Sequence, residues 1–275
     1  MLKSLSSAVS GLQGHQTMMD VIGNNIANVS TAGYQSSRVT FSDVYYLMLR
    51  PGNEGTTAVG GTNASQIGYG SQVASIDVLH TTGGMSTTYR ALDQYIDGSG
   101  YFIVQDSNEN EFYTKVGHLY FDVAGNLVDS NGNFVMGASG DELSDGYTPE
   151  LINVADLENY SSISVSSTGV ITGVDDTGAT EILGQVGLAS FTNQDALLEC
   201  GGCYFAKSSN SGEPVYGIPG DSAVGKLVSG ALEASNVDLS KEFTEMIMAQ
   251  RGFQANARVI TTSDEMLQEL VNLKR

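Results

Sequence analysis

The sequence has no tryptophan, four prolines, two cysteines and only 12 lysines and arginines among its 275 residues. So few basic side chains argue against a nucleic-acid partner, because such a partner requires a basic face that displaces its counterions. No apolar run approaches the roughly 18–20 residues of a membrane-spanning helix. The first eleven residues hold a lysine and four serines, and they lack the apolar stretch of a cleaved signal peptide. Scarce proline with 33 glycines indicates a turn-rich β protein.

The two cysteines, Cys200 and Cys203, are separated by two glycines. A zinc site would need two more ligands, and His15, His80 and His118 have no metal-ligand spacing to the cysteines or to one another. A thioredoxin-like motif would require a βαβ setting, which this region lacks. We therefore expect either a local disulfide or two free thiols.

Two acidic segments begin like calcium-binding loops, at Asp106 and at Asp129. Glu111 and Phe134 occupy the sixth position, where such a loop needs glycine. Both segments are therefore predicted to be plain turns. The sequence also lacks a nucleophile elbow, a glycine-rich phosphate loop and an HExxH motif, so we expect no catalytic site, cofactor or metal.

The negative charge is concentrated in the middle of the chain. Residues 1–34 sum to zero and residues 235–275 to −1, so the remaining 200 residues, with six basic and 24 acidic groups, carry −18 of the total −19. Two nearly neutral ends thus flank an acidic body, which would stay soluble beside its own copies. Ordinary surface solubility explains the same charge.

Both ends have the apolar spacing of a coiled-coil seam. The N-terminal series runs from Leu5 to Val29, with Gly33 as its expected stop. The C-terminal series runs from Leu239 to Val271, with Asn236 or Asp238 as its expected N-cap. Because each stripe alone would expose large side chains, we expect the two helices to pair; the alternative is that they lie on the β core. The predicted self-assembly seam comprises Leu5, Leu12, Met19, Ile22, Ile26, Val29, Leu239, Phe243, Met246, Phe253, Ile260, Leu267 and Val271.

The N-terminal helix also contains Asn24, Asn25 and Asn28. Asparagine is a poor helix former, so three within five residues require a reason. We expect them to form hydrogen bonds between subunits.

From Gly98 onward, short β-prone runs alternate with turn clusters such as Asn131–Asn133 and Asp175–Gly178. Strands without intervening helices predict an antiparallel sandwich or barrel. The fold class is therefore mixed α and β, with paired, coiled-coil-like terminal helices, an antiparallel all-β domain and an irregular connector. The predicted domains are 1–33 with 235–275 (helical), 34–75 (glycine-rich connector, with residues 50–70 extended and partly irregular) and 76–234 (antiparallel β).

Val21–Asn28 (VIGNNIAN), followed by Thr31–Tyr34 (TAGY), resembles the N-terminal signature of the bacterial flagellar rod and hook proteins. The resemblance covers nearly the whole chain, and its signature residues are Asn24, Asn25, Asn28, Gly33, Gln250 and Arg251. Further similar segments are Gly60–Asn63, Gln66–Gly68, Leu92–Phe102, Tyr113–Gly117, Gly230–Val237, Glu242–Phe253 and Thr261–Asp264. The sequence departs from the family's usual pattern at Ala64, where proline is frequent, and in having Cys200 and Cys203.

The resemblance implies a helical homopolymer in which the terminal helices form an inner domain that lines a tube and the β domain faces outward. It also implies export through the flagellar type III apparatus without a cleaved signal, to an extracellular place in the hook or basal body. The implied partners are copies of the chain, neighbouring rod and hook–filament junction proteins, the cap protein and the export apparatus. Within the family the sequence looks closest to short hook proteins of Gram-positive bacteria, which predicts a hook subunit that transmits torque; the alternative is a distal rod subunit. A carbohydrate-binding β module and an acid-catalysed hydrolase are the competing functions.

Overall fold

The computed structural model describes residues 2–55, 60–139, 147–154, 157–221 and 224–273. The chain forms two compact units. The first, which we call the helical unit, comprises residues 1–27, 37–78 and 237–275. The second, the β unit, comprises residues 28–36 and 79–236.

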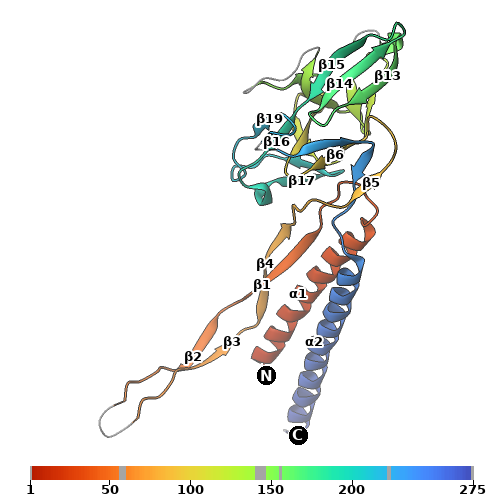
Figure 1. The fold of residues 1–275 in the computed structure, drawn as a ribbon. Coiled ribbons are helices and arrows are strands. Elements are labelled where there is room, and N and C mark those ends of the chain that lie inside the picture. The colour runs from red at the N-terminus through yellow and green to blue at the C-terminus, as the bar shows by residue number, and fades with distance from the viewer. Residues whose placement is uncertain (1, 56–59, 140–146, 155–156, 222–223, 274–275) are drawn as a thin grey trace. The chain divides into compact units, whose positions relative to one another are not determined.

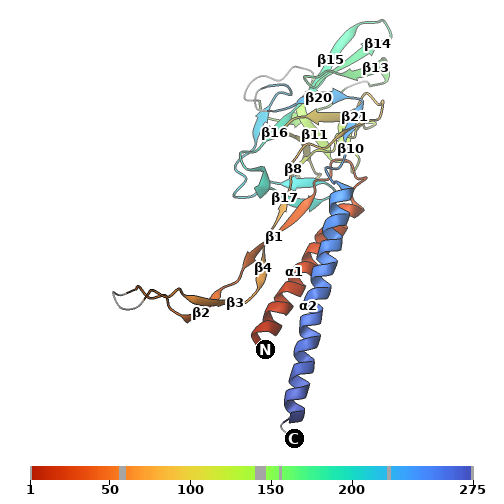
Figure 2. The same cartoon turned by 60° about the horizontal axis from the view of Figure 1, so that its bottom comes forward.

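The helical unit contains two long helices, α1 (Leu2–Ala27) and α2 (Leu239–Leu273). They lie side by side in Figures 1 and 2. Asp238 forms the N-cap of α2, since its Oδ1 accepts hydrogen bonds from the backbone N–H groups of Ser240 (2.9 Å) and Lys241 (3.3 Å). This confirms one of the two predicted caps. None of the described helices combines the length and the apolar character that a membrane crossing demands.

The same unit contains two antiparallel strand pairs, β1 with β4 and β2 with β3. The pair β1–β4 packs against α1. The sequence indicated only an extended, partly irregular connector here, because glycine, threonine and asparagine obscure the alternation of the short strands. Residues 56–59 of that predicted connector lie outside the described residues. The bounds are β1 Ser37–Asp43, β2 Tyr46–Arg50, β3 Ser65–Gly68 and β4 Ser71–Val78.

Among its described residues, the β unit is built on a 13-stranded antiparallel sheet whose main order is β13-β14-β15-β11-β7-β8-β18-β17. Two further pairs, β20–β6 and β21–β5, complete the described strands of this unit. The bounds are β5 Met85–Thr87, β6 Gln94–Asp97, β7 Tyr101–Gln105, β8 Glu111–Thr114, β9 Leu119–Phe121, β10 Leu127–Asp129, β11 Phe134–Ser139, β12 Glu150–Leu151, β13 Tyr160–Val165, β14 Val170–Asp175, β15 Thr180–Val186, β16 Leu188–Ser190, β17 Leu198–Gly201, β18 Tyr204–Ala206, β19 Val215–Gly217, β20 Lys226–Ser229 and β21 Ala231–Glu233; two short 3₁₀ helices span Leu157–Asn159 and Gln194–Ala196.

The predicted β middle is confirmed, because every described strand pair in it is antiparallel. Gly132 and Gly178 adopt the positive φ angles, 84° and 83°, that the predicted turns require. The core gathers apolar side chains from both halves of the sheet, including Phe102, Leu127 and Ile171, which are fully buried. The elements of the middle therefore follow from local sequence signals.

Candidate functional site

The two helices of the helical unit run antiparallel in close contact. Asn25 on α1 donates a hydrogen bond to Glu242 Oε2 on α2 (3.2 Å), and a Cβ on Gly11 would lie 2.6 Å from Asn256 Nδ2. In each pair the two residue numbers add up to 267, so α2 beyond about residue 266 has no α1 residue opposite it. Small residues such as Gly11 let the helices approach closely.

Four of the seven predicted C-terminal seam residues, Met246, Phe253, Ile260 and Leu267, lie seven residues apart and are half-buried. The buried residues of α2, Glu242, Ala249 and Ser263, follow the same seven-residue spacing. In contrast Leu239, Phe243 and Val271 are exposed in this single chain. On α1, Leu5, Leu12, Met19 and Ile26 are half-buried and Ile22 is buried, which leaves self-assembly through these residues a prediction.

Asn25 corrects the expectation that the three asparagines bond between subunits. It is buried, its Nδ2 donates to the Ser37 carbonyl (2.8 Å) and to Glu242, and its Oδ1 accepts the Ser37 N–H (3.0 Å). It thereby joins α1, β1 and α2 within one chain. The Asn28 carboxamide accepts a bond from Thr31 Oγ1 (3.2 Å) in the turn after the helix. Asn24, Gln250 and Arg251 are exposed, so their part in assembly stays a prediction.

Gly33 is not the stop of the first helix, which ends at Ala27. Gly33 does have a positive φ of 70°, and its N–H donates to the Glu233 carbonyl (2.9 Å). A Cβ there would lie 2.7 Å from Val116 Cγ2, so glycine is required by close packing in the β unit. Val29, the last residue of the predicted N-terminal series, is half-buried and also lies beyond the helix.

The helical unit exposes two apolar surfaces. One is the end of α2 past residue 266, which we call the α2 overhang, where Val271 is 65% exposed. Its exposed apolar residues are Met266, Leu270, Val271 and Leu273. The other surrounds the β2–β3 pair, where Val44–Leu49 form six consecutive exposed apolar residues. Contiguous exposed apolar surface of this kind marks interaction sites.

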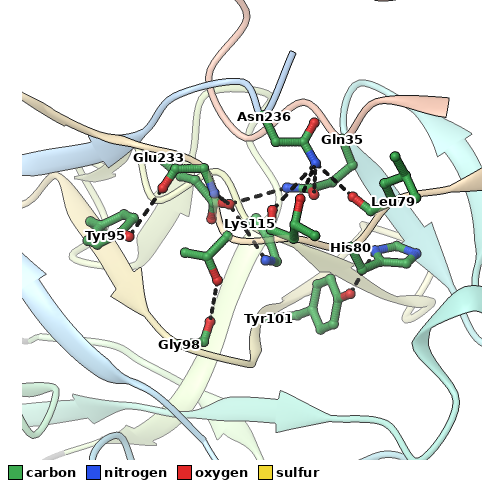
Figure 3. A network of polar contacts seen from close by, with 12 residues as sticks. Gln35, Leu79, His80, Tyr95, Gly98, Tyr101, Lys115, Glu233 and Asn236 are labelled. Carbon is green, nitrogen blue, oxygen red and sulfur yellow. Dashed lines mark hydrogen bonds and ion pairs between the residues drawn. The ribbon is translucent and has the colours of Figure 1, made fainter. Parts of the chain in front are cut away.

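The β unit contains a buried polar cluster (Figure 3). It gathers three segments, residues 33–36, 79–83 and 233–236, around Lys115 at the end of β8. Asn236 is the hub of its outer part: its Oδ1 accepts the Ser36 N–H (2.7 Å), and its Nδ2 donates to Gln35 Oε1 (3.0 Å) and to the Leu79 carbonyl (2.7 Å). The chain enters or leaves the β unit at each of these segments. The polar cluster therefore joins the ends of the chain segments that form the β unit.

Lys115 and Glu233 form an ion pair inside this cluster, with 3.6 Å between Nζ and Oε1. Their residues are 2% and 1% exposed. Glu233 Oε1 also accepts bonds from Gln35 Nε2 (3.2 Å) and from the Gly83 N–H (2.8 Å). The Lys115 ammonium lies 5.7 Å from the centre of the Tyr101 ring. Sequence reasoning missed this pair, because its residues are scattered along the chain and only a lysine among apolar neighbours marks it.

His80 lies beside the cluster and is hydrogen-bonded to the Tyr101 hydroxyl through Nδ1 (2.9 Å). Burial, followed by the positive charge of Lys115, lowers the pKa of His80 to about 4, with Asp195 opposing the shift. Burial also raises the pKa of the Tyr101 hydroxyl, with Glu233 adding to the effect. Both side chains are therefore neutral at pH 7.

We expect this histidine to make the β unit sensitive to acid. In the unfolded chain His80 takes up a proton near pH 6.5, but in the folded chain only near pH 4, so the unfolded state binds more protons between these values. The free energy of unfolding should fall by about 1–3 kcal/mol as the pH drops from 6.5 to 4. Urea denaturation at several pH values measures this slope, and His80→Gln should flatten it. An unchanged slope in that variant would contradict the assignment.

Cys200 and Cys203 are both free thiols in the structure. Cys200 lies in β17, and Cys203 lies in the turn of the β17–β18 hairpin, where its φ is positive, 63°. Burial, with a smaller contribution from Glu199, raises the pKa of the Cys203 thiol, which disfavours the reactive thiolate. The carboxylates of Asp106 and Asp129, at the two calcium-like segments, accept backbone bonds within their own turns.

Three family descriptions match segments of the chain. Residues 5–35 match the flagella basal body rod protein, residues 95–173 the flagellar hook protein FlgE/F/G D1 domain, and residues 228–273 the flagellar basal body rod FlgEFG protein C-terminal region. The first contains most of α1, the second contains β7–β13, and the third contains all of α2.

Rod proteins and hook proteins are among the relatives that align over the full length of the chain. The flagellar basal-body rod protein FlgG of Bacillus subtilis is 45% identical over 276 positions, which cover both chains completely. The FlgG of Borreliella burgdorferi is 33% identical over 279 positions, again covering both. The flagellar hook protein FlgE of Borreliella burgdorferi is 29% identical over an alignment of 445 positions that covers both chains.

Proposed function

The chain belongs to the flagellar rod and hook protein family, and from this premise we propose that it is a structural subunit of the distal rod, polymerising into the drive shaft of the flagellum. Membership makes it a structural component of the flagellum rather than an enzyme. The distal rod was the alternative in the sequence analysis; the comparisons support it better than the hook.

The observation that carries this proposal is the fit in length. The rod protein of Bacillus subtilis aligns with this 275-residue chain over 276 positions, so it needs almost no insertion. The alignment with the hook protein of Borreliella burgdorferi takes 445 positions, of which 170 stand opposite gaps in this chain. A hook protein of that length carries additional sequence that this chain lacks.

The exposed apolar surfaces support assembly into a polymer. The α2 overhang and the β2–β3 pair would expose large apolar side chains if the chain stayed alone, and each such side chain gains roughly 1.5–3 kcal/mol when buried. An isolated two-stranded ribbon is only marginally stable in water. A neighbouring copy that covers both surfaces would bury these side chains. The predicted seam residues Phe243 and Val271 therefore remain candidates for contacts between subunits.

The remaining features of this proposal come from the family resemblance. The subunit would be exported without a cleaved signal, lie outside the cytoplasmic membrane and contact rod and hook proteins at the two ends of its own stretch. The division into helical (1–33 with 235–275), connector (34–75) and β (76–234) domains, with a coiled coil facing inward, stays a prediction.

Genetic complementation distinguishes the distal rod hypothesis from the hook hypothesis. We expect the chain to restore motility and attached hooks in a Bacillus subtilis strain that lacks the rod protein FlgG, and to fail in a strain that lacks its hook protein. Electron microscopy of isolated basal bodies should show a straight rod. If the chain rescued only the hook-deficient strain and formed curved tubes, the distal rod proposal would be wrong and the hook hypothesis would be supported. Purified protein that forms no polymer under any assembly condition would contradict both.

A further inference from the structure

Tyr89 lies in an unusual conformation on the surface of the β unit. Its φ angle is 60°, in the left-handed region that favours glycine and asparagine, and its side chain is 92% exposed. The N–H groups of Thr88 and Tyr89 both donate to the Gly230 carbonyl, at 2.8 and 3.1 Å. The fold therefore holds a large aromatic ring in solvent on a strained backbone, where it gains nothing from packing within the chain.

A groove lies next to this residue. It has a volume of about 360 Å³ and runs between the 90–92 segment and strand β13, with Arg90, Leu92, Tyr160 and Ile163 among its lining residues. Strand β13 stands at one end of the main strand order, so one of its edges has no neighbouring strand among the residues that the structure describes. An exposed aromatic side chain thus precedes, in the chain, a segment that lines a partly apolar groove beside strand β13.

Arg90 gives this surface a defined charge preference. Its guanidinium is half exposed, with Nη1 2.7 Å from His118 Nε2 and 3.8 Å from the buried Asp93 carboxylate. Of the six basic residues between positions 35 and 234, Lys115 is buried with Glu233, and Arg38, Lys207 and Arg90 itself each lie within ion-pair distance of a carboxylate. Arginine keeps several further N–H donors that fit a carboxylate.

We propose that Tyr89, Arg90 and the adjoining groove form a contact surface for a second copy of this chain, which presents an acidic face to Arg90. This inference rests on the proposed polymer, in which copies are packed side by side. The body of each copy carries 24 acidic groups against six basic ones, so a neighbour's surface offers carboxylates, and tyrosine and arginine are the residues that most often dominate such contacts. The strained backbone holds the Tyr89 ring in solvent, where a neighbouring copy can contact it.

The absence of tryptophan from the sequence permits a direct test. Tyr89→Trp places a single indole at the site, in an equally strained conformation. Its emission should be that of an exposed indole in the monomer and shift to shorter wavelength when the protein polymerises. An emission that stays unchanged in a polymer formed normally would overturn the proposal.

Tyr89→Asn tests how much the tyrosine ring contributes to polymerisation, because asparagine removes the ring and tolerates the left-handed conformation. Its melting temperature should equal or exceed that of the wild type, whereas its critical concentration for polymerisation should rise at least tenfold. Val123→Ser, at another fully exposed apolar residue on a turn of the β unit, should change neither. Normal assembly of Tyr89→Asn, or a clearly lower melting temperature, would refute the inference, whereas a wild-type chain that never polymerises would refute the proposed function itself.

Discussion

Replacing Lys115 with methionine is expected to lower the free energy of unfolding of the β unit by about 3–5 kcal/mol, because removal of one partner of a buried ion pair leaves the other charge uncompensated. The remaining Glu233 carboxylate would keep Gln35 and the Gly83 N–H as donors, but it would lose the cation 3.6 Å away. For a domain of this size the melting temperature should fall by about 6–20 °C. Thermal and urea denaturation followed by circular dichroism measure both quantities.

Two further variants make this result specific. Lys207→Met removes the cation of a surface pair with Glu213, and it should cost less than about 1 kcal/mol. The double variant Lys115→Met with Glu233→Gln removes both charges and should recover a large part of the loss, because no unpaired charge is then buried. A single Lys115→Met variant as stable as Lys207→Met would contradict the structural role of the ion pair.

The strands of the β unit could be predicted, because their signals are local. Asn131-Gly-Asn133 and Asp175–Gly178 require positive φ angles between short β-prone runs, and they occur as turns between β10 and β11 and between β14 and β15. Strand order could not be predicted in the same way. The pairing of β11 with both β7 and β15 depends on packing between segments about 30 and 50 residues apart.

The two helices show how much of a buried helix face can be predicted from the spacing of apolar residues. Met246, Phe253, Ile260 and Leu267, at seven-residue spacing, are only half-buried, whereas the row of buried residues on α2 consists of Glu242, Ala249 and Ser263. A search for large apolar residues does not detect this row, because its members are small or polar. Small side chains in such a row let the two helices approach each other closely. The same reasoning explains Asn25, whose helix-disfavouring side chain is retained for three bonds within the chain.

The polar cluster lay beyond sequence reasoning for a different reason. Gln35, Lys115, Glu233 and Asn236 come from three distant parts of the chain, and nothing in the spacing of such residues predicts that they meet. Asn236 was considered as a helix cap, whereas the structure uses Asp238 for that purpose and leaves Asn236 to join residues 35–36 to residue 79. Long-range polar contacts emerge only from the folded topology.

An aspartate at the α2 overhang should abolish polymerisation while the monomer stays folded. Val271 is 65% exposed and lies in the same seven-residue row as the exposed Phe243, and the pairing of residues whose numbers add up to 267 leaves no α1 residue opposite it. Leu270 is exposed as well. We infer that another copy covers these side chains, and a buried, unpaired carboxylate at such a contact costs several kcal/mol, which amounts to more than a hundredfold in affinity at each contact.

The experiment compares three substitutions that each introduce one negative charge on α2. Val271→Asp should give a monomer with wild-type circular dichroism and melting temperature that forms no polymer by sedimentation or electron microscopy. Gln254→Asp, at an exposed position outside the overhang, should polymerise normally, which excludes a simple charge effect. Ile260→Asp, at a half-buried position, should instead lower the melting temperature of the helical unit. If Val271→Asp polymerised at the wild-type concentration, the overhang would have no part in assembly and the exposed seam residues would need another explanation.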